Sequence, residues 1–415
     1  MRFSGPMIPL FFTILLDMIG YGILIPVIPM LLAEPSSPHY LLPEGFSADQ
    51  GFVLYGVLVA MFSIGSFFAA PIIGQLSDHV GRKKMLLLSV FGTAIGHALF
   101  AIGIATRNLP LLFIARLADG LTGGNIAVAQ AAIADATRPE DRAKNFGLIG
   151  AAFGLGFIIG PFLGGKLADP SVVSWFDATV PFWFASLLAL ANTFFIWTML
   201  PETRPQASGR ITLAWSRSLA NVGKAFHHPA LRTLYSTQFL YQAGFAFYTT
   251  FAAVFFAIRF GFSEGDIGNY FAYVGLWIVF TQAVVTRIVT KHYSERTILR
   301  VSIATTALAI LAVSAIKDAE LLYVVAPFLA IANGLSLANM TSLLSRSAGA
   351  DVQGEVLGIG ASVSALAISI PPLVAGFIAA AITPEAPLPV ASGCIFLAAL
   401  VFIASYRRPA HPLSA

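Results

Sequence analysis

Long, uninterrupted apolar runs constrain this chain more than any other feature of its sequence. A helix of about 20 apolar residues crosses the hydrocarbon core of a bilayer, which is about 30 Å thick. A membrane β-barrel would instead show short segments of alternating polarity. The sequence therefore predicts an all-α membrane protein with twelve transmembrane helices. They are expected at about residues 7–32, 51–76, 84–105, 110–134, 145–168, 179–200, 231–258, 266–289, 297–316, 321–345, 356–382 and 388–406.

The composition agrees with this class and excludes several others. Of the 415 residues, 57% are hydrophobic and 11% are charged, whereas soluble domains carry about 25% charged residues. The single cysteine, Cys394, cannot form an intramolecular disulfide. Because the sequence contains no metal-ligand cluster, no nucleophile–base set and no soluble domain, we expect neither an enzyme nor a protein that binds a metal, a cofactor or nucleic acid.

The distribution of Lys and Arg predicts the orientation of the helices. If the N-terminus is cytoplasmic, 19 of the 24 Lys and Arg residues fall on the cytoplasmic side and four on the opposite side. Cytoplasmic loops carry an excess of these residues. We therefore expect a multi-pass protein of the cell membrane with both termini in the cytoplasm.

The sequence also predicts two related halves. The longest polar stretch divides the runs six and six, which gives an N-terminal half at 1–200, a cytoplasmic linker at 201–230 and a C-terminal half at 231–415. Gly120 and Asn125 recur 214 residues later as Gly334 and Asn339. Parallel halves of this kind occur in transporters, with the substrate site near mid-depth between them.

Four motifs then make the chain resemble the major facilitator superfamily. The stretch GQLSDHVGRKKML at 74–86 resembles the family's loop motif between helices two and three. RLADG at 116–120 resembles the fourth-helix motif of proton-coupled members. GFIIGPFLGG at 156–165 resembles the fifth-helix motif of drug/proton antiporters. LLDMIGYGILIPVIP at 15–29 is similar to the tetracycline/proton antiporter branch. The resemblance implies the major facilitator fold, a monomer, a bacterial inner membrane and proton-coupled efflux of a small amphipathic drug-like compound by alternating access.

The resemblance assigns two of these motifs to structural roles. The loop motif is expected to form a cytoplasmic gate, because a carboxylate can pair with Arg or with a helix N-terminus and hold that side closed. The gate residues within the motif are Gly74, Asp78, Gly81, Arg82 and Lys83. Asp135 and Asp141, at the cytoplasmic mouth, are expected to be gate or cap residues. The antiporter motif comprises Gly156, Gly160, Pro161, Gly164 and Gly165. Glycines at this spacing favour close helix packing.

Few charges lie within the predicted spans. An intramembrane charge costs at least ~2.5–3.5 kcal/mol, so such a residue is a functional candidate. Asp17, near mid-depth, is the first candidate for proton exchange, and Arg116 and Asp119 lie three residues apart on the fourth span. The alternatives are a permanently hydrogen-bonded Asp17 and a purely structural Arg116. The sequence leaves the role of His97 open between titration and packing.

Other polar and aromatic residues within the spans are expected to line the substrate cavity, although each could equally serve helix packing. They are Asn125, Gln238, Gln242, Tyr248, Trp277, Gln282, Asn333 and Asn339.

The chain also departs from the tetracycline/proton antiporters. Those proteins carry an Asp in helix three, a His in helix eight and an Asp in helix nine. This chain has Gly96, Ile278 and Thr305 at the aligned positions. The departure concentrates the expected proton coupling on the charges of the first half and leaves the substrate open. The alternative is a proton-coupled transporter of a metabolite or a siderophore, working as an exporter or an importer.

Overall fold

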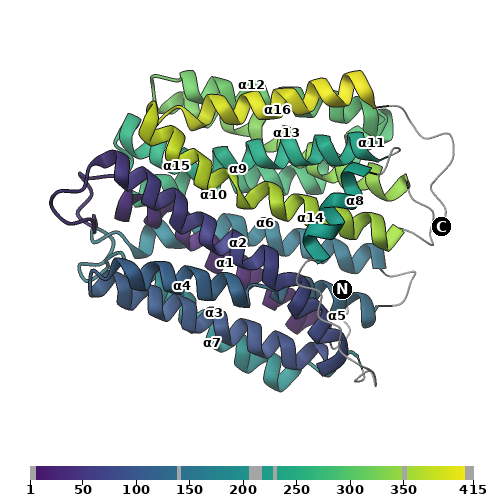
Figure 1. Ribbon diagram of the computed structural model, residues 1–415, viewed down its shortest axis with the longest axis horizontal. Coiled ribbons are helices and arrows are strands. Elements are labelled where there is room, and N and C mark those ends of the chain that lie inside the picture. Colours follow the sequence, from purple (N-terminus) through teal and green to yellow (C-terminus); the bar gives the residue numbers. More distant parts are fainter. Residues whose placement is uncertain (1–5, 138–141, 205–216, 228–230, 348–352, 407–415) are drawn as a thin grey trace. The chain divides into compact units, whose positions relative to one another are not determined.

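The computed structural model describes residues 6–137, 142–204, 217–227, 231–347 and 353–406 (Figure 1). Among these residues, twelve helical segments are long and apolar enough to cross a membrane, which confirms the predicted number. The segments are α1 (Met7–Leu32), α2 (Ala48–Val80), α3 (Arg82–Ala105), α4 (Leu109–Thr122) with α5 (Asn125–Asp135), α6 (Arg142–Leu167), α7 (Val180–Met199), α9 (Arg232–Phe260), α10 (Glu264–Phe280) with the π-helical turn η2 (Thr281–Val285) and α11 (Thr286–His292), α12 (Glu295–Ala315), α13 (Glu320–Arg346), α14 (Gln353–Ser369) with α15 (Pro371–Ala381), and α16 (Pro387–Ser405). A shorter helix, α8 (Arg217–His227), precedes α9.

Three of the spans are interrupted, which the sequence did not predict. The fourth breaks into α4 and α5 at a pair of glycines, and a Cβ atom on Gly124 would come within 2.7 Å of the Ile73 side chain. The eighth passes through η2. The eleventh restarts at Pro371 and Pro372, since proline lacks the N–H that a continuous helix requires but is tolerated in a first turn. The first break matters most here, because it creates a helix start inside a span.

The helices form two compact units. Unit 1 comprises the described residues within 1–51, 61–215 and 262–272, and unit 2 those within 52–60, 216–261 and 273–415. The units differ from the predicted halves at two helices, since each unit includes a short segment of the other half. Close glycine contacts explain both exchanges. Gly56 of α2 lies against the backbone of Gly376, and Gly268 of α10 lies against that of Gly165.

Within unit 1, α1 packs along α6, and α3 packs on α4 and α7. The core where α1, α3 and α5 meet is largely aliphatic, with Leu10 and Ile14 of α1, Leu86 and Val90 of α3 and Val128 of α5 all 2% exposed or less. This packing fixes the positions of α1, α3 and α5, the helices that carry the polar side chains described below.

Within unit 2, α9 packs on α14 and α16, and α12 packs on α13 and α16. Aromatic side chains of α9 are buried, and Tyr241 donates a hydrogen bond of 2.7 Å to the Asn333 side chain of α13. The segment of α2 in this unit is held by Tyr55, whose hydroxyl donates to the Thr250 carbonyl at 2.5 Å. Its ring also contacts that of Phe251 edge-on.

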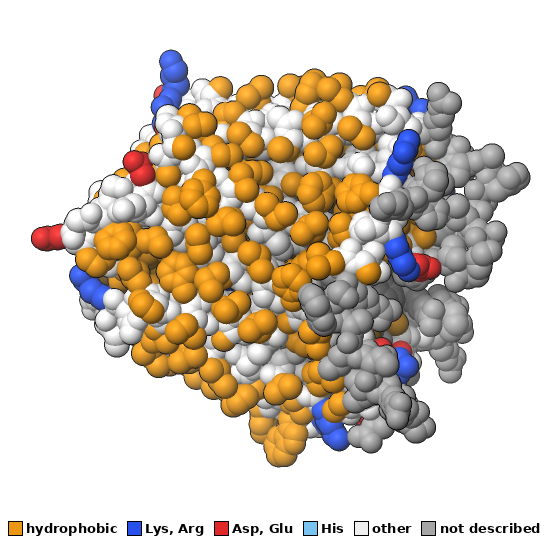
Figure 2. Space-filling view, in the orientation of Figure 1, with side chains coloured by type: hydrophobic (Ala, Val, Ile, Leu, Met, Phe, Trp, Pro, Cys, Tyr) orange, Lys and Arg blue, Asp and Glu red, His pale blue; other side chains and the backbone are white. Residues whose placement is uncertain are grey.

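The outer surface is apolar. On the face drawn in Figure 2, hydrophobic side chains predominate, and the few charged side chains lie toward its two edges. Large hydrophobic side chains such as Leu187, Phe194 and Trp197 are each more than 60% exposed. Such a surface is stable only against lipid, and the protein is accordingly a multi-pass membrane protein.

Candidate functional site

The break between α4 and α5 places a polar side chain opposite the acid of α1. Asn125 is the first residue of α5 and is 3% exposed. Its side-chain amide donates a hydrogen bond to Asp17 Oδ1, and its own Oδ1 accepts from the Ile126 amide at 2.9 Å. The first turn of a helix carries a partial positive charge. The break thereby gives Asp17 a side-chain amide partner at a helix start within the spans.

A buried ion pair lies nearby on α4. Arg116 Nη1 is 3.3 Å from Asp119 Oδ2, and the two residues are 4% and 6% exposed. The guanidinium also lies 4.7 Å from the centre of the Phe62 ring, which is within cation–π range. Asp119 is close enough to Asp17 to interact with it electrostatically. The structure thus brings together the three charges that the sequence singled out.

His97 of α3 belongs to the same site. It is 5% exposed and lies within electrostatic range of Asp119 and Arg116. A Cβ atom on Gly20 of α1 would come within 3.3 Å of His97 Nε2. The imidazole therefore occupies the space that the glycine leaves beside α1. We call Asp17, His97, Arg116, Asp119 and Asn125 the Asp17 cluster.

Gly96 of α3 lies against Asp119 of α4. A Cβ atom at this position would lie 3.0 Å from Asp119 Cβ. An aspartate at position 96 would add a second carboxylate directly against Asp119. The compact contact between α3 and α4 thus depends on this glycine.

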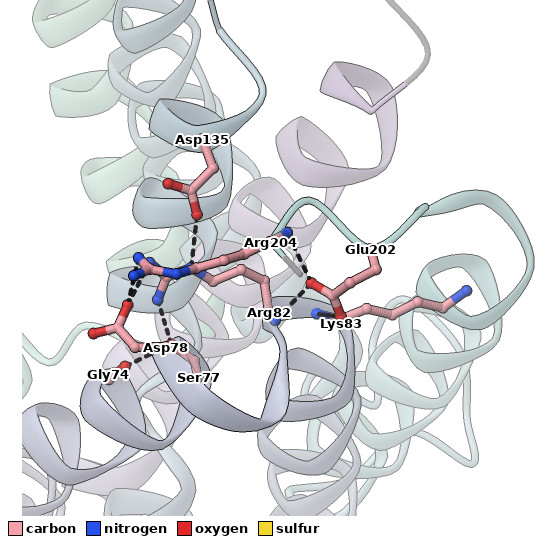
Figure 3. A network of polar contacts seen from close by, with 8 residues as sticks. All are labelled: Gly74, Ser77, Asp78, Arg82, Lys83, Asp135, Glu202 and Arg204. Atoms are coloured by element: carbon pink, nitrogen blue, oxygen red, sulfur yellow. Dashed lines mark hydrogen bonds and ion pairs between the residues drawn. The ribbon is translucent and has the colours of Figure 1, made fainter. Parts of the chain in front are cut away.

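A second polar network surrounds Arg82 at the start of α3 (Figure 3). Arg82 is 5% exposed and pairs with Asp78 Oδ1 at 2.7 Å and with Asp135 Oδ2 at 2.9 Å. Its Nη1 also donates to Ser77 Oγ at 2.5 Å. Gly81, between α2 and α3, has φ +110°, a conformation that favours glycine. One arginine thereby joins the end of α2, the start of α3 and the end of α5.

Two members of this network were missed from the sequence. Glu202, just after α7, accepts hydrogen bonds from the backbone amides of Arg82 at 2.8 Å and Lys83 at 3.2 Å. Arg204 pairs with Asp78 Oδ1 at 2.9 Å and donates its backbone amide to Glu202 Oε1 at 3.1 Å. Glu202 satisfies free N–H groups at the start of α3, where a carboxylate is stabilising. The signal was a Pro-Glu-Thr-Arg stretch at the end of the sixth span.

The remaining gate residues have different positions. Gly74 accepts a hydrogen bond of 2.7 Å from Ser77 through its carbonyl. Lys83 takes part through its backbone amide. Asp141 lies outside the described residues.

The glycines of the antiporter motif form the contact between α1 and α6. Cβ atoms on Gly156 and Gly164 would collide with Met18 and Ile23, and one on Gly160 would come within 2.8 Å of Gly22 Cα. Pro161 lies on the same surface, because a Cβ atom on Gly22 would come within 2.7 Å of its ring.

The expected cavity residues of unit 2 divide into two groups. The first group makes packing contacts: Gln238 donates to Ser364 Oγ at 2.7 Å, Asn333 accepts from Tyr241, Asn339 donates to the Leu335 carbonyl of its own helix at 2.8 Å, and Tyr248 is 2% exposed. The second group is partly or fully exposed: Gln242, Trp277 and Gln282. The second group is therefore better placed to meet a substrate.

The fold is that of a multi-pass membrane protein with buried charges inside its spans. The sequence model of the Major Facilitator Superfamily matches residues 10–372 and 234–415. The chain therefore belongs to the major facilitator superfamily, and the resemblance found in its motifs is confirmed.

Two relatives show how much of the chain the similarity covers. The class H tetracycline resistance protein of Pasteurella multocida is 32% identical over 370 residues, which cover 88% of this chain and 86% of that protein. Major facilitator superfamily domain-containing protein 10 of Bos taurus is 30% identical over 312 residues, which cover 67% of this chain and 66% of that protein.

Solved structures confirm the fold. The human organic anion transporter MFSD10 (TETRAN) has a TM-score of 0.71 and 25% identity, covering 96% of this chain and 98% of that one. A D-xylose–proton symporter has a TM-score of 0.76 at 17% identity, covering 97% and 98%. The chain is thus a transporter of this superfamily with the predicted twelve-helix architecture.

Proposed function

We propose that this transporter exports a small amphipathic, drug-like compound in exchange for protons by alternating access. The observation that carries the proposal is the Asp17–Asn125 hydrogen bond within the spans, beside the buried Arg116–Asp119 pair. The relatives that are named for tetracycline resistance support the direction of transport.

Proton exchange at Asp17 would change its contact with α5. As a carboxylate, Asp17 accepts a charge-assisted hydrogen bond from Asn125, and such bonds are about twice as strong as neutral ones. Protonation removes the charge and with it the attraction to the start of α5. The contact between α1 and α5 then weakens, which couples a proton to a movement of helices.

The Arg82 network is proposed as the cytoplasmic gate. It holds the ends of α2, α5 and α7 to the start of α3, and Asp78, Arg82 and Asp135 were expected to close this side. The distribution of Lys and Arg supports a cytoplasmic position for this end, the linker and both termini. The bacterial relatives support a bacterial inner membrane. A monomer is expected, since one chain supplies all twelve spans.

Flux measurements in proteoliposomes test the proton role. We expect a pH gradient to drive uptake of tetracycline or a comparable amphipathic dye into inverted vesicles containing the wild-type protein. Asp17→Asn keeps the size of the side chain but cannot exchange a proton, so gradient-driven uptake should be lost. Asp318→Asn, at an exposed position between α12 and α13, is the matched control. Unchanged proton-driven flux in Asp17→Asn would exclude the assigned role.

A second candidate is transport of an organic anion, which includes anionic metabolites and siderophores, in either direction. Similarity to the structure titled human organic anion transporter MFSD10 supports it. Arg116 adds a buried cation to unit 1. A thermal-shift screen of the purified protein distinguishes the candidates: stabilisation by carboxylate compounds but not by tetracyclines would favour the second.

A further inference from the structure

Unit 2 contains a cavity that the proposed transport mechanism does not use. It lies between α11, α12 and α13 and has a volume of about 440 Å³, within the range of ~300–1,000 Å³ that is usual for small-molecule sites. Its walls are mostly apolar. Val289, Val301, Phe328, Ile331 and Leu335 contribute to them.

The cavity reaches the outer surface of the spans. Val301 of α12 is 62% exposed, Phe328 of α13 is 61% exposed and Tyr293, just before α12, is 60% exposed. Exposed apolar side chains on spanning helices face the hydrocarbon of the bilayer. The cavity is therefore accessible to a lipid acyl chain.

Basic residues gather at one end of this cavity, next to its lining residue Tyr293. Arg287 and Lys291 lie on α11, and Arg296 and Arg300 lie on the first turns of α12. The nearby acid, Glu295, is already paired with Arg346 at 3.1 Å.

Two of these cations have unused donors. The Nε atoms of Arg296 and Arg300 are buried and have no hydrogen-bond partner among the described residues. A buried donor without an acceptor is costly, and phosphate oxygens are acceptors that suit arginine. The positive charge of these residues favours an anionic group at the end of an apolar cavity, and Arg296 donates in addition through Nη2 to the Tyr406 carbonyl at 3.1 Å.

We propose that this cavity binds an acyl chain of an anionic glycerophospholipid whose phosphate headgroup contacts the basic residues between 287 and 300. Basic pockets between membrane helices on the cytoplasmic side are suited to such headgroups, and the Lys and Arg distribution predicts this end to be cytoplasmic. A second copy of the chain would bring the same cations to the contact and be repelled. The proposal does not depend on the transported substrate.

Native mass spectrometry of the full-length protein tests the site. The purified protein is delipidated, and phosphatidylglycerol or phosphatidylcholine is then added at matched acyl composition. We expect the wild-type protein to retain phosphatidylglycerol preferentially. The double variant Arg287→Gln, Lys291→Gln should weaken phosphatidylglycerol binding about twenty-five-fold, because each cation near an anionic lipid contributes about fivefold. Its phosphatidylcholine binding should be unchanged. Lys317→Gln, exposed at the far end of α12, is the charge control.

A bulky substitution tests the cavity itself. Val301→Trp should fill it and reduce binding of both lipids. Val324→Trp, at a 60% exposed position of α13 that does not line the cavity, is the matched control. Equal retention of the two lipids by the wild-type protein, or equal lipid binding by the two tryptophan variants, would overturn the proposal. If the wild-type protein forms a dimer that Val301→Trp abolishes without reducing lipid binding, the cavity is occupied by a second copy of the chain, and the proposal is overturned.

Discussion

Replacing Arg82 by glutamine should destabilise unit 1 by about 2–3 kcal/mol. The side chain makes two ion pairs, at 2.7 and 2.9 Å, and a hydrogen bond to Ser77. Bonds to charged groups contribute about 1.5–3 kcal/mol each. The Asp78 and Asp135 side chains are 39% and 27% exposed, so solvent screening lowers each contribution toward about 1 kcal/mol. The three contacts together give the stated range.

Thermal unfolding of the detergent-purified protein, followed by tryptophan fluorescence, measures this effect. At about 2–4 °C per kcal/mol for a unit of this size, Arg82→Gln should lower Tm by about 5–10 °C. Lys84→Gln removes the same charge two residues later at an exposed position and should change Tm by less than about 2 °C. Asp135→Asn should lower the free energy of unfolding less in the Arg82→Gln background than in the wild-type protein, and the difference between the two effects should be about 1 kcal/mol. Equal Tm values for Arg82→Gln and Lys84→Gln would refute the reasoning.

Four further substitutions have calculable effects on the same Tm measurement. Glu202→Gln removes the charge at the start of α3 and replaces one of the two acceptor oxygens by an NH2 donor, which should cost about 1–2 kcal/mol. No change would mean that the carboxylate does not cap this helix. Gly160→Ala places a Cβ atom 2.8 Å from Gly22 Cα and should cost about 1–3 kcal/mol. Gly150→Ala, where a Cβ atom meets nothing within 4 Å, should instead stabilise α6 by about 0.5–1 kcal/mol. A higher Tm for Gly160→Ala than for Gly150→Ala would contradict the α1–α6 contact. Tyr55→Phe should cost about 1 kcal/mol through loss of its bond to α9, and a neutral result would exclude that bond.

Much of the fold follows from the sequence because its signals are local. A run of 20 apolar residues specifies a spanning helix without reference to the rest of the chain. The Arg82 network was found for a similar reason: charges are rare here, so Asp78, Arg82 and Asp135 were conspicuous near helix ends. The part of the network that was missed is not local. Glu202 binds amides about 120 residues earlier in the chain, and only the packing of α7 on α3 brings them together.

The exchange of helix segments between the units escaped prediction for another reason. Its cause is the absence of side chains at Gly56 and Gly268, which lets two backbones approach. A glycine in a sequence does not indicate which helix it will face. His97 was ambiguous in the same way, because the space it occupies is left by Gly20 on a different helix.

The two copies of the internal repeat differ where the polar chemistry lies. Gly120 and Asn125 correspond to Gly334 and Asn339, yet α13 is continuous through its copy. There the asparagine donates to a carbonyl of its own helix, whereas Asn125 begins a new helix and donates to Asp17.

The cause of this difference is the glycine pair before Asn125, since the second copy has leucine and alanine at those positions. A continuous helix satisfies its own backbone groups and leaves no partial positive charge at mid-span. A broken helix exposes free N–H groups that favour a carboxylate. The acidic residue matching Asp119 is also replaced in the second copy, by Asn333. The proposed proton exchange therefore concerns unit 1 alone, and substitution of the glycine pair by Leu-Ala should remove the helix start that carries the Asn125 partner of Asp17.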